Sequence, residues 1–359
     1  MFVAWRDLRF AKGRFALMGT VIVLITLLVG LLSGLTAGLG RQNISAITGL
    51  SADRIAFAAP SSGQDVSYSN STVTREQWKR WAEAPGVSSA EPLGISTTKA
   101  TAGGRSEGVS VFGVRPGSGL APDGGKIDDR SVVLSTAAAD GLGAKPGDTV
   151  TVAGRRLTVA ATSGDASFSH TPVIWTSLTT WQKTAPPTGG PAATVIALTT
   201  TSGAEVNATD KALGTKTVSK DDSLSAIGSY TSENGSLQLM RGFLFAISAL
   251  VIGAFFTVWT IQRSGDVAVL KALGASTADL LKDALGQAVV LLVGGTLLGT
   301  GIAVAVGSAV SGSAVPFLLT PATVLVPAAV MILLGALGAA LSIRRITSVD
   351  PLTALGSAR

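Results

Sequence analysis

The residues that could do chemistry are few, and their spacing matches no catalytic motif. The chain has no cysteine and one histidine, His170, so neither a thiolate site nor a two-histidine zinc site can form. No G-x-x-x-x-G-K-[ST] phosphate loop occurs, so the chain should not hydrolyse ATP itself. His170 lies in a Ser/Thr-rich stretch and is interpreted as a surface or turn residue, and Asp128-Asp129 as a solvated turn. We expect no enzyme, no metal and no permanently bound cofactor.

The elements that must position any functional residue follow from composition. Of 359 residues, 47% are hydrophobic and only 14% are charged, against about 25% in soluble domains. The apolar residues gather in runs of the length that crosses a bilayer core, roughly 20 residues. We expect transmembrane helices at 15–39, 237–261, 284–310 and 323–343, with an external turn at 311–322. The net charge of +6 comes from basic residues near the ends of these runs, which favours lipid headgroups over nucleic acid as the partner.

Residues 1–14, MFVAWRDLRFAKGR, predict an amphipathic helix at the cytoplasmic membrane surface, with aromatic and basic residues on opposite faces. A signal peptide is the rival interpretation. The apolar run that follows is too long for one and lacks a small-residue cleavage site. We therefore expect this segment to be retained, followed by the first transmembrane helix.

The first span carries Gly30, Gly34 and Gly38 at four-residue spacing. Such overlapping small-xxx-small motifs let helix backbones approach closely. Two alternatives remain open: the glycines pack against other spans of the same chain, or they form the seam of a homodimer.

Residues 40–236 are polar, rich in Gly, Ser and Thr, and contain no run long enough to span a membrane. Thr74 and Gln77 form a capping box that opens a helix over 75–84. The runs 149–152 and 157–160 alternate around a short turn and predict a hairpin. Further strands are expected at 54–58, 109–114, 132–134 and 195–198. The insert is predicted to be one α+β domain, and the fold class is an α-helical membrane protein that carries it.

The orientation follows from the distribution of basic residues. They precede the first span, occupy the loop 262–283 and return in the tail 344–359. Basic residues in short loops mark the cytoplasmic side, whereas long domains are exempt from the count. We expect both termini and the loop in the cytoplasm of a cell with the chain in its plasma membrane, and the 40–236 domain outside.

The loop 262–283 contains VAVLKALGAS at 267–276, a short helix that Gly274 would end. Its apolar face could pack on its own transmembrane helices or enter a groove on a partner. The block resembles the signature loop of FtsX-like and MacB-like permeases, the membrane subunits of type VII ABC transporters, although Asp266 stands where Glu is usual. The resemblance implies two permeases and two copies of a separate ABC ATPase. The residues expected to contact the ATPase are Asp266, Val267, Leu270, Lys271, Leu273 and Gly274.

Stretches distributed over the whole chain resemble one branch, the Hrt-type haem-efflux permeases. They are 32–45, 165–170, 227–230, 244–262, 316–320 and 349–356. The resemblance implies export of haem that has partitioned into the membrane, with tyrosine ligands near the outer membrane face. Tyr230 occupies such a position, either as iron ligand or as an interfacial aromatic, and Met240 follows on the same helix as thioether or apolar wall. Phe168 stands where relatives can have Tyr, and its ring cannot coordinate iron. Arg41 would pair with a propionate or with lipid phosphate.

Two functions from different classes stay open. The chain is the permease of an ATP-driven efflux pump for haem or another amphiphile, in which haem is substrate and ATP acts only through the partner. Alternatively, it is an FtsX-like mechanotransmitter that regulates an external partner through an exposed apolar surface and moves no substrate. A lipoprotein-releasing permease is a third possibility.

Overall fold

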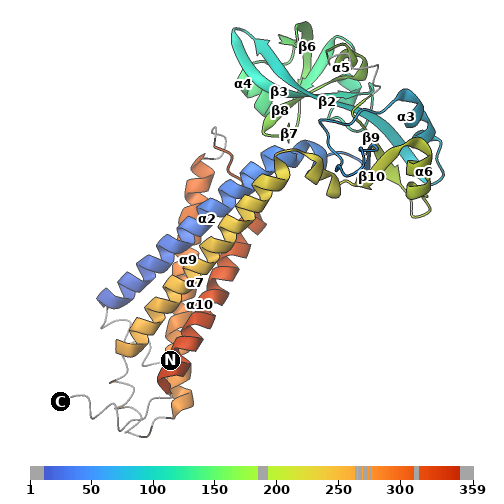
Figure 1. The fold of residues 1–359 in the computed structure, drawn as a ribbon. Coiled ribbons are helices and arrows are strands. Elements are labelled where there is room, and N and C mark those ends of the chain that lie inside the picture. Colours follow the sequence, from blue (N-terminus) through green and yellow to red (C-terminus); the bar gives the residue numbers. More distant parts are fainter. Residues whose placement is uncertain are drawn as a thin grey trace. The chain divides into compact units, whose positions relative to one another are not determined.

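The computed structural model describes residues 12–184, 193–262, 276–310 and 315–347, together with the single residues 265, 269 and 274. The chain divides into two compact units, Met1–Gly38 with Ser236–Arg359, and Leu39–Gly235. We call the first the helical unit and the second the sheet domain. Each is treated separately, and Figure 1 shows the elements of both.

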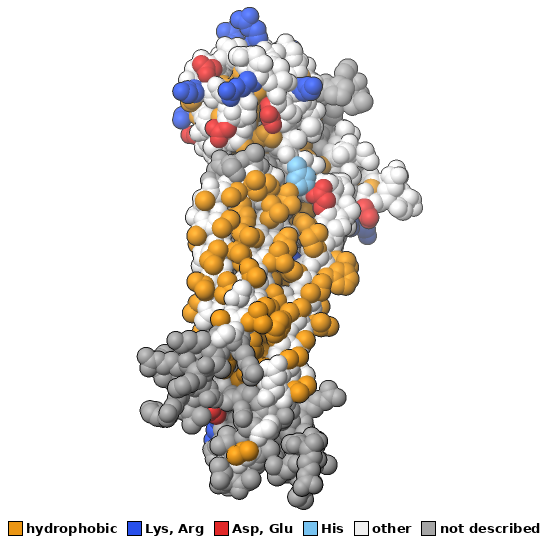
Figure 2. Space-filling view, turned by 90° about the vertical axis from the view of Figure 1, so that its left-hand side faces the viewer, with side chains coloured by type: hydrophobic (Ala, Val, Ile, Leu, Met, Phe, Trp, Pro, Cys, Tyr) orange, Lys and Arg blue, Asp and Glu red, His pale blue; other side chains and the backbone are white. Residues whose placement is uncertain are grey.

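The helical unit is built from four long apolar helices, α2 (Lys12–Thr48), α7 (Tyr230–Gln262), α9 (Thr277–Val310) and α10 (Pro321–Thr347). All four are long and apolar enough to cross a membrane. Each starts earlier or ends later than the apolar run alone suggests, because polar residues continue the helix beyond the bilayer length. Figure 2 shows hydrophobic side chains covering the visible face of this unit.

The helices of this unit approach closely at glycines. A Cβ built on Gly30 would lie 2.9 Å from Ala303 of α9, and one on Gly34 would lie 2.3 Å from the ring of Phe317. A Cβ on Gly38 would lie 2.0 Å from the Pro316 carbonyl oxygen. All three glycine faces are thus filled by the same chain. The structure shows packing within one chain at all three glycines, and their role in a homodimer seam stays a prediction.

Phe317, in the segment that joins α9 to α10, works as a wedge. Its ring lies against Gly34 on α2 and against Gly307 on α9, where a Cβ would come within 2.4 Å. The N–H of the next residue, Leu318, donates to the Gly34 carbonyl oxygen at 3.0 Å. A side chain larger than hydrogen at either glycine would displace the ring, so glycine is required there by space rather than by backbone conformation.

The sheet domain contains ten paired strands in the order β10-β1-β9-β2-β3-β8-β4-β6-β5, with β7 paired to β8. The strands are β1 Arg54–Ala58, β2 Val87–Ala102, β3 Arg105–Val114, β4 Ser131–Leu134, β5 Thr149–Val152, β6 Arg155–Thr162, β7 Ser167–Phe168, β8 Thr171–Ser177, β9 Val195–Thr200 and β10 Thr215–Ser219. The α-helices that follow or join them are α3 Arg75–Ala82, α4 Thr136–Leu142, α5 Leu178–Thr184 and α6 Val206–Leu213. Short 3-10 turns are η1 Gly124–Lys126 and η2 Asp222–Ala226.

One half of the sheet closes on itself. The far end of β2 pairs with β5, through Ala100 with Val152 and Thr101 with Thr151, so β2-β3-β8-β4-β6-β5 form a small barrel. Its interior is filled by alternating apolar side chains from these strands. Trp181 of α5 packs on Gly94 and Gly113, paired residues of β2 and β3, where a Cβ would lie 2.3 and 2.4 Å from atoms of its side chain.

The other half is the antiparallel sheet β10-β1-β9 with the first part of β2. Its strands send alternate residues to opposite faces, as the pleat requires. Along β9, Ile196 and Leu198 pack with α3 and α6, whereas Val195 and Ala197 pack in the core that also receives the end of α2. The sheet is therefore covered on both faces, and α2 is anchored on one of them.

Several local predictions are confirmed. Thr74 and Gln77 form the capping box of α3. The hairpin forms between β5 and β6, although its loop is only Ala153-Gly154, both at positive φ, so β6 begins earlier than expected. The amphipathic helix 1–14 falls largely outside the described residues, as does most of the tail 344–359.

Candidate functional site

The candidate site lies in the sheet domain, around the last turns of α2. Ala46, Ile47 and Leu50 are buried in the domain core. Lys220 donates its ammonium group to the carbonyl oxygens of Thr48 at 3.1 Å and Leu50 at 3.0 Å, which satisfies groups left open at the helix end. The end of α2 is therefore a fixed part of the sheet domain, and polar residues on it have defined partners.

The loop that contains β7 docks on this end of α2. The N–H groups of Ser169 and His170 donate to the carbonyl oxygens of Asn43 and Gln42, at 3.0 and 3.1 Å. Both loop residues have positive φ, 48° and 63°, an uncommon conformation for residues with a Cβ. The two hydrogen bonds from these consecutive N–H groups to α2 stabilise the strained turn.

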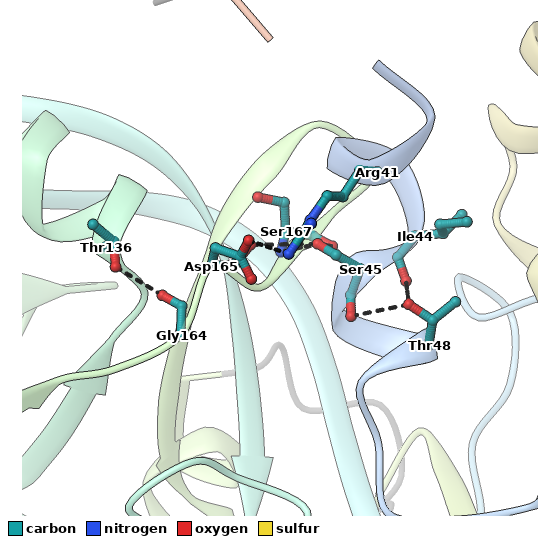
Figure 3. A network of polar contacts seen from close by, with 8 residues as sticks. All are labelled: Arg41, Ile44, Ser45, Thr48, Thr136, Gly164, Asp165 and Ser167. Carbon is teal, nitrogen blue, oxygen red and sulfur yellow. Dashed lines mark hydrogen bonds and ion pairs between the residues drawn. The ribbon is translucent and has the colours of Figure 1, made fainter. Parts of the chain in front are cut away.

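A second set of contacts fixes the start of the same loop, and Figure 3 shows it from close by. Ser45 of α2 accepts the N–H of Ser167 at 2.8 Å and bonds to the Asp165 carbonyl oxygen at 3.4 Å. The Arg41 guanidinium forms an ion pair with the Asp165 carboxylate. Their side chains are 46% and 64% exposed, so the pair is in contact with water.

The first turn of α7 meets α2 and the loop through a polar cluster. Asn43 is only 1% exposed, and its side-chain amide donates to Glu233 at 2.9 Å and to the Ser229 hydroxyl at 3.2 Å. The same Glu233 oxygen lies 2.6 Å from His170 Nε2, which carries the proton because a carboxylate accepts. Glu233 thereby joins α7, the loop and α2.

Tyr230, the first residue of α7, is half-buried against the aromatic part of the core. Among the described residues, the structure gives its hydroxyl no hydrogen-bond partner. The other tyrosine of the chain, Tyr68, is 4% exposed and donates to the Ser223 hydroxyl at 3.0 Å. Burial raises the pKa of Tyr68 well above its usual range, so it stays a neutral phenol. Of the two tyrosines, only Tyr230 can offer its oxygen to a ligand.

The remaining predicted site residues fall in different places. Phe168 is 7% exposed and packs edge-on against Tyr68 and Phe112, with ring centroids 5.5 and 5.6 Å apart. It is a core residue of the sheet domain, and its contact with a substrate stays a prediction. Met240 is 49% exposed on the part of α7 that belongs to the helical unit. The coupling residues Asp266, Val267, Leu270, Lys271 and Leu273 lie outside the described residues. Gly274 is described and has φ 93°, which fits a helix-ending glycine.

Acidic residues elsewhere in the sheet domain serve the fold. Asp128 accepts the N–H groups of Arg130 and Ser131, each at 2.7 Å, and these bonds lower the pKa of its carboxyl. Asp129 accepts the Ser177 hydroxyl at 2.5 Å. The prediction of a turn at this pair is confirmed. In the described ranges no three His, Asp or Glu residues gather as a metal site.

Sequence reasoning did not assign Asn43, Asp165 or Glu233 to a site. Its prediction that His170 is a surface or turn residue is confirmed, because His170 is exposed in the turn after β7. The signal that could have found Asn43 is the polar turn Arg41-Gln42-Asn43, which directly follows a long apolar run. The signal for Glu233 is weaker. Acidic residues are common in the first turn of any helix, because they interact favourably with the helix dipole.

Four helices long and apolar enough to cross a membrane, joined to a sheet-rich domain, are the organisation of a membrane protein that carries a folded domain. Residues 15–216, more than half of the 359, match the family described as the MacB-like periplasmic core domain, and residues 239–351 match the FtsX-like permease C-terminal family. The chain belongs to the MacB/FtsX type of ABC transporter permeases. Such a permease resides in a membrane and works with an ATPase partner.

Two relatives align with this chain over almost their whole length. The chain is 26% identical over 361 residues to a putative hemin transport system permease of Staphylococcus haemolyticus, and the match covers 99% of each chain. It is 26% identical over 372 residues, again 99% of each, to an ABC transporter permease of Mycobacterium tuberculosis. The periplasmic region of MacB from Actinobacillus actinomycetemcomitans is similar with a TM-score of 0.37 and 15% identity, covering 50% of this chain and 94% of that one.

Proposed function

We propose that the chain is the permease of an ATP-driven efflux transporter that removes haem, or a similar amphiphile dissolved in the membrane. The observation that carries this proposal is the similarity to a putative hemin transport permease along 99% of both chains, which includes the sheet domain as well as the helices. Haem is the transported substrate here and not a resident cofactor.

Energy would come from two copies of a separate ATPase that binds the cytoplasmic loop 262–283. In this scheme two permeases form a homodimer, both termini are cytoplasmic and the sheet domain is extracytoplasmic. The end of α2 packs in the core of the sheet domain through Ala46 and Ile47. In this scheme the helices would transmit the ATPase stroke to the domain.

Tyr230 is the proposed iron ligand. It is the one tyrosine whose oxygen is not committed to a buried hydrogen bond, and a phenolate is a known haem ligand type. Met240 would supply a soft thioether or an apolar wall from the exposed face of α7. Position 168 is a buried phenylalanine, whose ring cannot coordinate iron, so Tyr230 would act without a second tyrosine at that position.

The alternative, regulation of an external partner protein, needs an exposed apolar surface on the sheet domain. The large hydrophobic side chains that are exposed run from Leu17 to Leu28 and from Leu239 onward, and none of those described between 39 and 235 is among them. They therefore belong to the helical unit, where lipid covers them. This distribution favours efflux.

The proposal is tested by titrating the full-length chain, in nanodiscs, with ferric haem and following absorbance. A saturable spectral shift is expected for the wild type, and Tyr230→Phe should lose or alter it. Tyr68→Phe is the matched control and should keep the wild-type spectrum. If haem only partitions into the lipid, without saturation and without a difference among the three proteins, haem is not the substrate.

A further inference from the structure

A narrow pocket lies inside the helical unit, among α2, α9, α10 and the segment that joins α9 to α10. Most of its lining residues are apolar or glycine, but three are threonines: Thr26 of α2, Thr300 of α9 and Thr323 of α10. Every lining residue belongs to the helical unit, and none comes from α7. The pocket therefore shares no residue with the polar cluster around Tyr230 and Glu233.

Thr26 brings a hydroxyl without a partner to this pocket. The residue is 3% exposed, and its Oγ1 has no hydrogen-bond partner among the described residues. A threonine in a helix often bonds to the carbonyl oxygen four residues earlier, and Thr26 makes no such bond. Inside an apolar helical unit a buried hydroxyl without a partner costs free energy, so this group needs a partner from outside the chain.

Pro327 leaves a second polar group open at the same place. It is a buried residue inside α10. Because proline has no N–H, the carbonyl oxygen of Thr323, four residues earlier, does not receive its usual helical hydrogen bond. The Thr323 hydroxyl is used elsewhere, since it donates to the carbonyl oxygen of Leu318 at 3.0 Å. Thr323 and Pro327 both line the pocket, and freed backbone groups in membrane helices are satisfied by neighbouring hydroxyls or by ordered water.

We propose that this pocket is a binding site for one water molecule inside the helical unit. The water accepts the Thr26 hydroxyl and donates to the Thr323 carbonyl oxygen, with the Thr300 hydroxyl as a third partner. Three partners are the usual number for a buried water, and the narrow space fits one group of that size but no amphiphilic substrate. The site connects α2, α9 and α10, and it is independent of what the transporter carries.

Thr26→Val tests the site through the sign of its effect on stability, because valine has the shape of threonine without the hydroxyl. If Thr26 holds a water, the substitution removes one of its partners. The apparent melting temperature of the full-length chain in nanodiscs should then fall by about 2–4 °C, the shift for one lost hydrogen bond in a unit of this size. If the hydroxyl has no partner at all, valine removes an unsatisfied buried group, and the melting temperature should stay the same or rise.

Thr296 of α9 is the matched control. It is 1% exposed, and its Oγ1 also has no partner in the part of the chain that the structure describes, but it does not line the pocket. Thr296→Val should therefore leave the melting temperature unchanged or raise it. An equal loss in Thr296→Val and Thr26→Val would overturn the proposal, because the loss would then come from the substitution and not from the pocket.

A second measurement detects the water itself. Hydroxyl radicals that X-ray pulses generate from water label the side chains next to bound water. Pro327 is buried, so in the wild type it should be labelled only through the pocket, and Thr26→Val should lose most of this label. Met331, about one turn further along α10, is 1% exposed, has a more reactive side chain and does not line the pocket, so it should stay unlabelled.

The proposal requires both results. A wild-type Pro327 without label would overturn it, and so would a Thr26→Val variant that melts at or above the wild-type temperature. Haem titration of the same variant separates this site from the proposed function, since Thr26→Val should keep the wild-type haem spectrum. A changed spectrum would place Thr26 in the substrate path and would also overturn the assignment to a water site.

Discussion

Asn43, in the last turns of α2, donates its buried side-chain amide to Glu233, in the first turn of α7, at 2.9 Å. The two residues are 190 positions apart in the chain. The contact joins, inside the sheet domain, the two helices through which the chain enters and leaves that domain. Any relative movement of these helices must stretch or break it.

Replacing Asn43 should therefore destabilise the protein. Asn43→Ala removes the buried amide that donates to the Glu233 carboxylate and to the Ser229 hydroxyl, and we expect a loss of about 1–3 kcal/mol in unfolding free energy. Thermal unfolding of the purified chain measures it. Asn70 is exposed, and Asn70→Ala should stay within about 0.5 kcal/mol of the wild type. Equal stability of both variants would show that the amide network contributes nothing.

Phe168→Tyr tests whether position 168 can become an iron ligand. The ring is packed against Tyr68 and Phe112, so an added hydroxyl would be buried without a partner, at a cost of about 1–3 kcal/mol. We expect lower thermal stability and a haem spectrum identical to that of the wild type. A new ferric phenolate band in Phe168→Tyr, seen in neither the wild type nor Tyr230→Phe, would contradict the assignment of Phe168 to the core.

Gly34→Ala tests the wedge of Phe317. The added Cβ would lie 2.3 Å from the ring, and overpacking of this kind costs about 1–3 kcal/mol. Gly19→Ala on the same helix meets nothing within 4 Å and should be neutral or stabilising. Combining Gly34→Ala with Phe317→Ala should recover part of the loss, because the clash partner is gone. A penalty that is the same with and without the phenylalanine would rule out the wedge.

Leu270→Asp tests the coupling loop. In the sequence, Leu270 lies on the apolar face of the loop helix, and a charge there should loosen the contact with the ATPase. We expect assembled transporter to lose substrate-stimulated ATP hydrolysis while haem binding to the permease persists. Ala272→Asp, a charge on the same short segment away from that face, is the comparison. Wild-type stimulation in Leu270→Asp would remove the loop from the coupling path.

Much of the helical unit could be predicted because a bilayer imposes a length and a composition on every span. The run after Arg241 is apolar for that length, and the structure has α7 there. Local rules also predicted the capping box of Thr74 and Gln77, because such a box depends on residues three positions apart. What such rules miss is where a helix continues past the bilayer. The helix α2 continues to Thr48 because Ala46 and Ile47 pack in the core of the sheet domain. The residues of that core are distant in the chain, so the local sequence does not predict this extension.

The sequence by itself determined the apolar spans, the absence of a phosphate loop and the resemblance to the permease family, because each depends on residues that are close in the chain. Only the tertiary structure decided which partners the polar residues have. Arg41 meets Asp165 across 124 positions, and His170 meets Glu233 across 63. It also showed that Phe168 is enclosed by aromatic rings while Tyr230 keeps an uncommitted oxygen. Burial and ion pairing arise from folding of distant segments onto one another, and neither is encoded by local spacing.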